Sequence, residues 1–121
     1  MSLVFTLPIP PSINALYFNR VYVAGSKRKG RGKTPAGKAF DTHAGLLLAR
    51  QRANGIKGKV IVTYEVARFP DKRRRDVSNF EKPLSDALVA NGIIEDDSLI
   101  ERLTIGWADG IEGVRVTVEA A

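Results

Sequence analysis

Apolar and polar residues alternate along four segments of the chain, and this alternation predicts β-strands. The predicted strands cover residues 2–7, 57–68, 99–107 and 113–119. Prolines follow the first segment and end it, while β-branched residues are frequent in the second. The last two segments are separated only by Ala-Asp-Gly-Ile-Glu at 108–112, so we expect them to form a hairpin.

Two further segments have apolar residues at helical spacing. The first begins at Thr34, which can cap the helix, and at Pro35, because proline is well tolerated at the first helical position. The second begins near Asn79 or Phe80, since Pro83 must lie within about the first turn, and Asn79 is a good N-cap residue. Each helical pattern is followed by an Asn-Gly pair, which is a typical helix end.

The order of these elements is β-α-β-α-β-β, which predicts an α+β fold. We expect a small mixed β-sheet of about four strands with two helices packed on one face, forming a single domain over residues 1–121. Residues 8–33 are expected to be mostly irregular, with a basic flexible loop at about 24–33.

Composition excludes several kinds of site. The chain has no cysteine, so disulfides, thiolate zinc sites and cysteine nucleophiles are excluded. His43 is the single histidine and cannot form a multi-histidine metal site. No apolar run approaches the roughly 18 residues of a membrane span, and no signal peptide is recognisable, so we expect no membrane association and a cytoplasmic location.

The chain is basic, with 19 Lys and Arg residues against 13 Asp and Glu, a net charge of +6 and a pI near 9.9. Twelve of the 19 cations lie in residues 20–38 and 68–75. Such a segregated positive charge is typical of nucleic-acid-binding proteins. A solvated basic surface that aids solubility explains the net charge equally well.

Carboxylates flank the second predicted helix, with Asp76 just before it and Asp96 and Asp97 beyond its far end. Two like charges 4 Å apart repel by about 1 kcal/mol in water and about 4 kcal/mol at an effective dielectric constant of 20. A cluster of carboxylates is therefore costly unless a cation lies among them. If the sheet brings these loops together, they form a site for Mg²⁺, which prefers oxygen ligands. Alternatively, an arginine within 73–75 supplies the balancing cation, or the acidic triplet at 95–97 is a solvated turn.

Lys82 falls early in the second helix, where the helix dipole disfavours a cation unless a phosphate lies nearby. It can instead pair with Asp86, four residues later, and Asp86 itself is more simply read as that ion-pair partner. Tyr17, Phe18 and Tyr22 precede the basic run and can either stack on unpaired bases or pack against the sheet. Core packing is the better explanation for Trp107, Phe5, Phe40 and Tyr64. Asp71 is expected to have no specific role.

Three stretches together resemble the RusA family of Holliday junction resolvases. They are Leu-Pro-Ile-Pro-Pro-Ser-Ile-Asn-Ala-Leu-Tyr at 7–17, Pro-Asp-Lys-Arg-Arg-Arg-Asp-Val-Ser-Asn-Phe-Glu-Lys at 70–82 and Ser-Asp-Ala-Leu-Val-Ala-Asn-Gly-Ile-Ile-Glu-Asp-Asp at 85–97. The resemblance covers one whole domain and implies a crossover junction endodeoxyribonuclease, a homodimer that uses Mg²⁺ or Mn²⁺ to cut four-way or branched DNA during recombination and repair.

Carried over by position, the resemblance makes Asp76, Asp96 and Asp97 the metal ligands, with Lys82 as a fourth catalytic residue. It also implies a DNA-binding set: Asn14, Lys27, Arg28, Lys29, Arg31, Lys33, Lys72, Arg73, Arg74, Arg75 and Asn79.

Ser78 departs from the family pattern, which commonly has a second aspartate there. Glu95 or Glu81 could supply the missing carboxylate, or more water could complete the metal shell. The alternative to the enzyme is therefore a non-catalytic or weakly active protein that binds nucleic acids selectively according to the structure of the nucleic acid.

Overall fold

The computed structural model describes residues 2–11, 17–19, 31–51, 54–71 and 74–121. Four strands form one mixed sheet in the order β1-β6-β4-β5. These strands are β1 (Ser2–Leu7), β4 (Val60–Ala67), β5 (Ile100–Ala108) and β6 (Val114–Ala120). β4 and β5 are parallel, whereas β6 is antiparallel to both β1 and β4. The expected α+β fold with a small mixed sheet of four strands is confirmed.

The expected hairpin between the last two strands is wrong. β5 and β6 do not pair with each other; they lie on opposite sides of β4. β5 reaches β4 through a helical crossover and is therefore parallel to it, while the chain then returns across the sheet end to place β6 antiparallel on the other side. This return passes Gly113, which has φ +67° and approaches Leu7 so closely that a Cβ atom would lie 2.4 Å from the Leu7 carbonyl oxygen.

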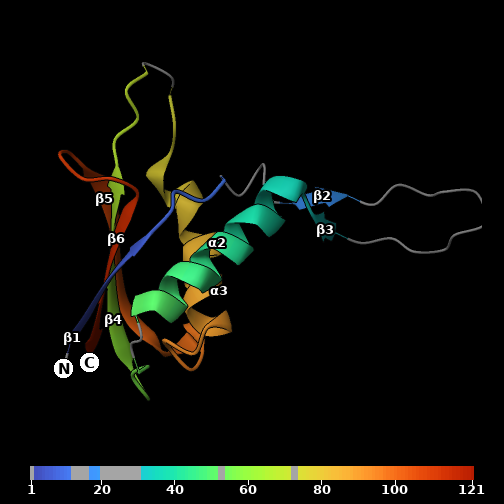
Figure 1. The fold of residues 1–121 in the computed structure, drawn as a ribbon. Coiled ribbons are helices and arrows are strands. Elements are labelled where there is room, and N and C mark those ends of the chain that lie inside the picture. The colour runs from blue at the N-terminus through green and yellow to red at the C-terminus, as the bar shows by residue number, and fades with distance from the viewer. Residues whose placement is uncertain (1, 12–16, 20–30, 52–53, 72–73) are drawn as a thin grey trace, which may run out of the picture.

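Two helices, α2 (Pro35–Gln51) and α3 (Glu81–Ala90), cover one face of the sheet, as expected (Figure 1). The start of α2 is also as expected, because Thr34 Oγ1 accepts a hydrogen bond of 3.2 Å from the Gly37 amide. α3 begins at Glu81, close to the predicted start near Asn79 or Phe80, but the prediction of Asn79 as its N-cap is wrong. Asn79 lies within a preceding 3₁₀ turn, η1 (Val77–Phe80), and provides no cap to α3, whose N-cap position is Phe80.

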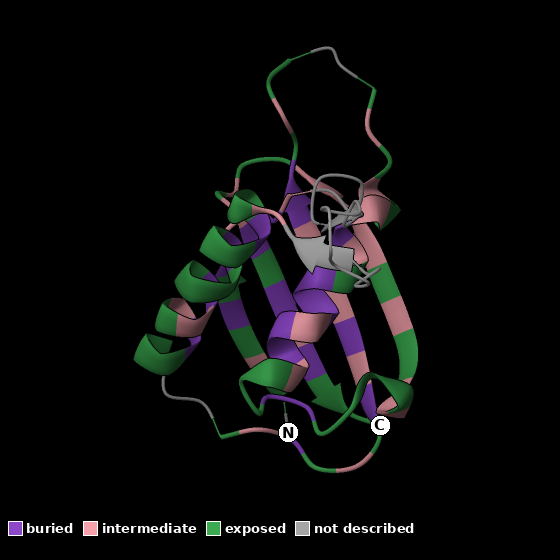
Figure 2. Cartoon of the chain, turned by 90° about the vertical axis from the view of Figure 1, so that its right-hand side faces the viewer, coloured by how far each residue is buried: buried purple, intermediate pink, exposed green. Residues whose placement is uncertain are grey.

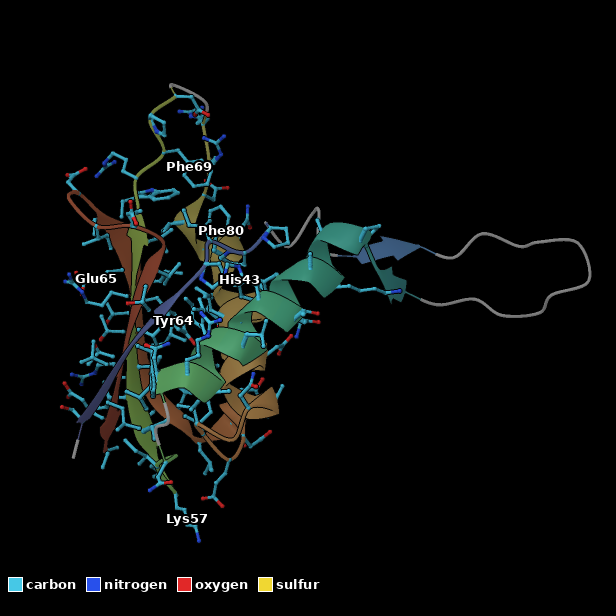
Figure 3. All side chains as sticks on the ribbon, in the orientation of Figure 1. His43, Lys57, Tyr64, Glu65, Phe69 and Phe80 are labelled. Atoms are coloured by element: carbon cyan, nitrogen blue, oxygen red, sulfur yellow. The ribbon has the colours of Figure 1, made fainter. Side chains whose placement is uncertain are left out.

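The hydrophobic core lies between the two helices and the sheet. Buried and more exposed residues alternate along β4 and β6, so that one face of each strand contributes to the core (Figure 2). In Figure 3, Tyr64 points from β4 toward the helices, while its neighbour Glu65 lies on the opposite face of the sheet. There Glu65 Oε1 lies 3.6 Å from Arg115 Nη1, so the uncovered face carries this ion pair.

Part of the segment expected to be irregular is ordered into a second, two-stranded sheet. β2 (Tyr17–Asn19) pairs antiparallel with β3 (Arg31–Lys33). Residues 31–33 of the basic loop expected at about 24–33 thus belong to β3, while its residues 24–30 lie outside the described part of the chain. Within the described ranges, none of the helices combines the length and the apolar character needed to cross a membrane.

Candidate active site

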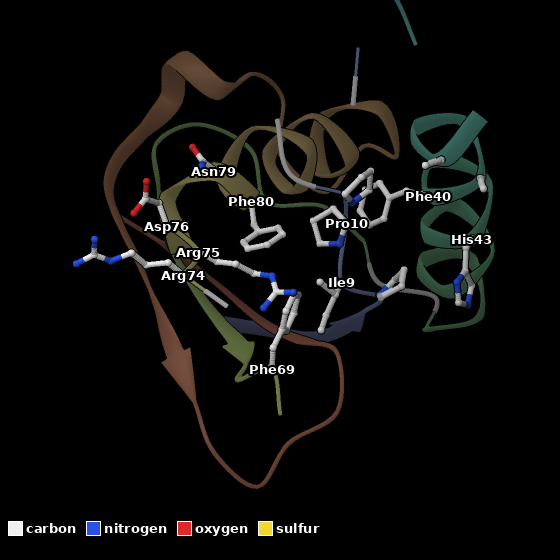
Figure 4. Close-up of a pocket in the computed structure, with 14 residues that line it drawn as sticks. Ile9, Pro10, Phe40, His43, Phe69, Arg74, Arg75, Asp76, Asn79 and Phe80 are labelled. Carbon is white, nitrogen blue, oxygen red and sulfur yellow. The ribbon is translucent and has the colours of Figure 1, made fainter. Parts of the chain in front are cut away.

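A pocket of about 960 Å³ opens beside the end of β4 (Figure 4). Its walls come from the proline-rich segment after β1, the first half of α2, the loop after β4, and η1. The lining residues are Pro8, Ile9, Pro10, Pro11, Ala36, Ala39, Phe40, His43, Phe69, Arg74, Arg75, Asp76, Asn79 and Phe80. Four of the residues singled out from the sequence, at positions 74, 75, 76 and 79, therefore line one pocket.

Arg75 crosses this pocket, and its guanidinium group is held on one face and along one edge. The carbon at the centre of the guanidinium lies 3.9 Å from the centroid of the Phe69 ring. Nη1 and Nη2 donate hydrogen bonds of 2.5 and 2.9 Å to the two carboxylate oxygens of Asp71, and this interaction raises the pKa of Arg75. Asp71 thus has a specific role, contrary to the expectation from the sequence.

Asp76, the N-cap residue of η1, and Asn79, within η1, lie at the rim of the pocket (Figure 4). The Asn79 amide donates a hydrogen bond of 3.0 Å to the Asp76 carbonyl oxygen, which closes the 3₁₀ turn. The Asp76 side chain is exposed and makes no capping hydrogen bond. Ser78, in the same turn, is exposed as well. A carboxylate oxygen and an amide side chain are thus presented to solvent at one edge of the pocket.

Asp96 and Asp97 lie outside this pocket, at the start of the 3₁₀ turn η2 (Asp97–Leu99) that leads into β5. Asp96 is the N-cap residue of this turn and accepts hydrogen bonds from the hydroxyl and the amide of Ser98, the latter at 3.2 Å. The Ser98 hydroxyl is the largest cause of a lowered Asp96 pKa, followed by the Ser98 amide. Asp97 is exposed.

The sheet does not bring these two regions together in one chain. Asp97 lies three residues before Ile100, which pairs with Val60 at the beginning of β4. The η1 turn that follows Asp76 packs beside the other end, because the Phe80 ring centroid lies 6.0 Å from that of Trp107, the β5 residue paired with Val66. In the part of the chain that is described, no group of three or more His, Asp or Glu residues could hold a metal ion. The three-aspartate metal site stays a prediction.

Two glutamates, Glu95 and Glu81, were expected as possible replacements for the carboxylate that is absent at Ser78. Both already accept hydrogen bonds from protein groups. Glu95 accepts a hydrogen bond of 2.6 Å from the Gly58 amide, near the beginning of β4. Glu81 accepts one of 2.6 Å from the Ser85 hydroxyl, which in turn lies 2.8 Å from the hydroxyl of the buried Tyr64. These bonds fix both carboxylates to neighbouring protein groups.

Lys82 lies in the first turn of α3 and is half-exposed. Its Nζ atom lies 3.5 Å from Asp86 Oδ2. The ion pair with Asp86, which the sequence predicted as the alternative to phosphate binding, is therefore present. Exposed pairs of this kind contribute only about 0.3–0.5 kcal/mol, so the amine can exchange Asp86 for a phosphate at small cost.

The predicted DNA-binding residues divide between β3, the pocket rim and segments outside the described residues. Arg31 and Lys33 lie in β3, and only their backbone is described. Arg74 is described, exposed and at the pocket rim. Outside the described residues lie Asn14, Lys27, Arg28, Lys29, Lys72 and Arg73, together with Tyr22.

Sequence reasoning missed two arrangements in this region. The stacking of Arg75 on Phe69 joins residues six positions apart in an irregular loop, where no periodic pattern could indicate it. The chain of hydroxyls and carboxylate from Tyr64 through Ser85 to Glu81 joins β4 to α3, and only the spacing of Glu81 and Ser85 on one helix face gave a signal.

Comparison with known proteins gives a consistent result. The family model described as Endodeoxyribonuclease RusA matches residues 19–119. A protein of Enterobacteria phage HK97 named crossover junction endodeoxyribonuclease rusA is 31% identical over 116 residues, which is 93% of this chain and 83% of the relative. The proteins of the same name from Enterobacteria phage 82 and from Escherichia coli K12 are 33% and 31% identical over 99 residues, covering 78% of this chain and 73% of each relative.

Proposed function

Because the chain belongs to the RusA endodeoxyribonuclease family, we propose that it is a metal-dependent DNA endonuclease that resolves four-way junctions. The observation that carries this proposal is the family match, which spans most of the domain at residues 19–119. The names of the relatives, crossover junction endodeoxyribonucleases, favour catalysis over binding alone. The reaction would take place on cellular or phage DNA, in the cytoplasm.

We place the metal at Asp76. Its carboxylate is exposed at the pocket rim beside the Asn79 side chain, and both offer the oxygen ligands that Mg²⁺ prefers. Mg²⁺ commonly takes one or two carboxylates, several waters and the oxygens of a substrate phosphate. A bound Mg²⁺ or Mn²⁺ supplies Lewis acidity and lowers the pKa of a bound water.

Asp97 would complete this site only from another copy of the chain. Within one chain, η2 and η1 lie at opposite ends of the β4–β5 pair, with α3 running between them along the sheet (Figure 1). A homodimer in which Asp97 of one copy approaches Asp76 of its partner would unite the predicted ligands. Two such sites related by a two-fold axis suit a junction in which two strands of like polarity are cut.

The cations of the chain would hold the DNA. Lys82 would leave Asp86 and stabilise negative charge on the phosphate that is cut. Arg74, exposed at the pocket rim, would bind the backbone together with the cations at 27–33 and at 72–73. Contacts of this kind give affinity without reading sequence and make binding strongly dependent on salt.

Incubation of a synthetic four-way junction with the protein and either Mg²⁺ or Mn²⁺ tests the proposal. Paired nicks at the point of strand exchange would support it. A junction that is bound but never nicked in either metal would leave only the non-catalytic alternative.

A further inference from the structure

The pocket beside Asp76 has walls that phosphate binding does not require. On one side lie Pro10, Ile9 and the ring of Phe80, which are apolar and face the cavity (Figure 4). A phosphate is small and charged, so a cation and hydrogen-bond donors would be enough to bind it. Apolar walls instead fit a flat ring with apolar faces, such as a nucleobase that has left its stack.

Arg75 provides the second element of the pocket. One face of its guanidinium plane covers Phe69, and both of its terminal nitrogens bind Asp71. About a quarter of the Arg75 side chain remains exposed, at 23%. A guanidinium plane that is already fixed at its edge and at one face is suited to stack against a planar ring, and unpaired bases commonly stack in this way.

Polar groups stand where the edge of such a ring would lie. The side chains of Asn79 and His43 line the pocket on opposite sides, and Asn79 is next to Asp76 at the rim. An amide offers both a donor and an acceptor to the edge of a base. The volume of about 960 Å³ also leaves room for the sugar and for water.

We propose that this pocket holds one unstacked nucleobase of branched DNA, stacked on Arg75, from the nucleotide next to the phosphate at Asp76. This inference rests on the proposed function, because it takes DNA as the substrate. Bases at the point of strand exchange are the easiest to unstack, so the pocket both recognises the branch point and fixes which phosphate reaches Asp76. The base that it accepts then determines where along the strand the cut falls.

The test is a binding measurement in EDTA, which does not depend on cleavage. Four-way junctions are prepared in which each nucleotide nearest the exchange point is replaced in turn by an abasic analogue. Wild-type protein is expected to bind one of these abasic junctions about tenfold more weakly than the intact junction, since stacking a base on a protein side chain contributes about that much. Equal affinity for the intact and all abasic junctions would overturn the proposal.

Two variants separate the pocket from general binding. Ala39→Trp fills the pocket from an exposed position of α2, and it should bind the intact junction as weakly as the wild type binds the abasic one. Ala49→Trp makes the same change at an exposed position farther along α2, outside the pocket, and should behave as wild type. An Ala39→Trp protein that still distinguishes the two junctions would contradict the proposal.

Arg75→Lys keeps the positive charge but removes the planar guanidinium group on which a base would stack. It should lose the difference between intact and abasic junctions while keeping the salt dependence of binding. If Ala39→Trp instead converts the DNA-free protein from dimer to monomer in light scattering, the pocket is filled by a second copy and the proposal is wrong. Failure of the wild type to nick in Mg²⁺ would count against the endonuclease proposal alone, because the abasic comparison uses no metal.

Discussion

Asp76 and Asp97 lie at opposite ends of the same parallel strand pair. Asp97 precedes Ile100, which pairs with the first residue of β4, and Asp76 precedes the turn that packs against Trp107, near the last residues of β4 and β5. Eight residues of extended strand span roughly 25 Å. The strand register therefore separates the turns that carry the two carboxylates within one chain, and we expect a shared metal site to form between two copies.

Mixing two inactive variants tests whether the two aspartates meet between copies of the chain. Asp76→Asn and Asp97→Asn are each expected to abolish nicking of a four-way junction. In a mixed dimer with sites shared between copies, one site keeps both aspartates, so nicking of one strand should return when the two proteins are unfolded and refolded together. Mixed protein that stays inactive would mean that each site uses the aspartates of one chain after a rearrangement.

Ser78 allows the number of carboxylates beside Asp76 to be changed. Ser78 is exposed in η1, two residues after Asp76, so Ser78→Asp adds a second carboxylate to the same turn. We expect faster nicking at low Mg²⁺ concentration, because a more negative site binds a divalent ion more tightly. Asn54→Asp adds the same charge at an exposed position before β4 and should leave the metal dependence unchanged.

Lys82 and Asp86 provide a matched pair of variants on α3. Lys82→Ala should reduce the nicking rate by about 100-fold, as loss of one charge-stabilising donor does, while junction binding falls only a few-fold. Asp86→Ala removes the partner at 3.5 Å and should leave nicking intact or slightly increased. Equal losses of binding and nicking in Lys82→Ala would show that the lysine only holds the DNA backbone.

Tyr64 should make the stability of the fold depend on alkaline pH. Burial raises its pKa well above the ordinary value, against a smaller opposite effect of the Ser85 hydrogen bond. The folded state therefore keeps this proton where the unfolded chain loses it, so the free energy of unfolding falls as pH rises above about 10.

Urea unfolding of wild type and Tyr64→Phe at pH 7 and pH 10.5 measures this effect. At pH 7 the variant should lose about 1 kcal/mol, the usual contribution of one such hydrogen bond. Between the two pH values the wild type should lose more stability than the variant, because only the wild type has this buried hydroxyl. Equal losses would show that Tyr64 does not titrate differently on unfolding.

The strands and helices could be predicted because their signals are local. Alternation along 57–68 reflects one buried face of a strand, and β4 confirms that strand. Thr34 and Pro35 mark a helix terminus, and α2 begins there. Strand neighbours are not local properties. β6 is buried between β1 and β4, with Val114, Val116 and Val118 in the core, whereas the consecutive Glu101 and Arg102 of β5 suit an edge strand.

The candidate site was only partly predictable for a related reason. The sequence indicates which residue types carry metal and phosphate chemistry, and Arg74, Arg75, Asp76 and Asn79 do line one pocket. It could not indicate that the region around Asp97 lies at the other end of the sheet, because that depends on the parallel register of β4 and β5. Nor could it indicate that Asp71 turns Arg75 onto Phe69.

The most direct test of the central claim is a cleavage assay on a synthetic four-way junction, comparing wild type with Asp76→Asn in Mg²⁺, in Mn²⁺ and in EDTA. The wild type should introduce paired nicks at the exchange point in at least one of the metals and none in EDTA, while Asp76→Asn should bind the junction and leave it intact in all three. A wild-type protein that binds the junction but nicks it in neither metal, or an Asp76→Asn protein that nicks as fast as wild type, would contradict the assignment of this chain as a resolvase with its metal at Asp76.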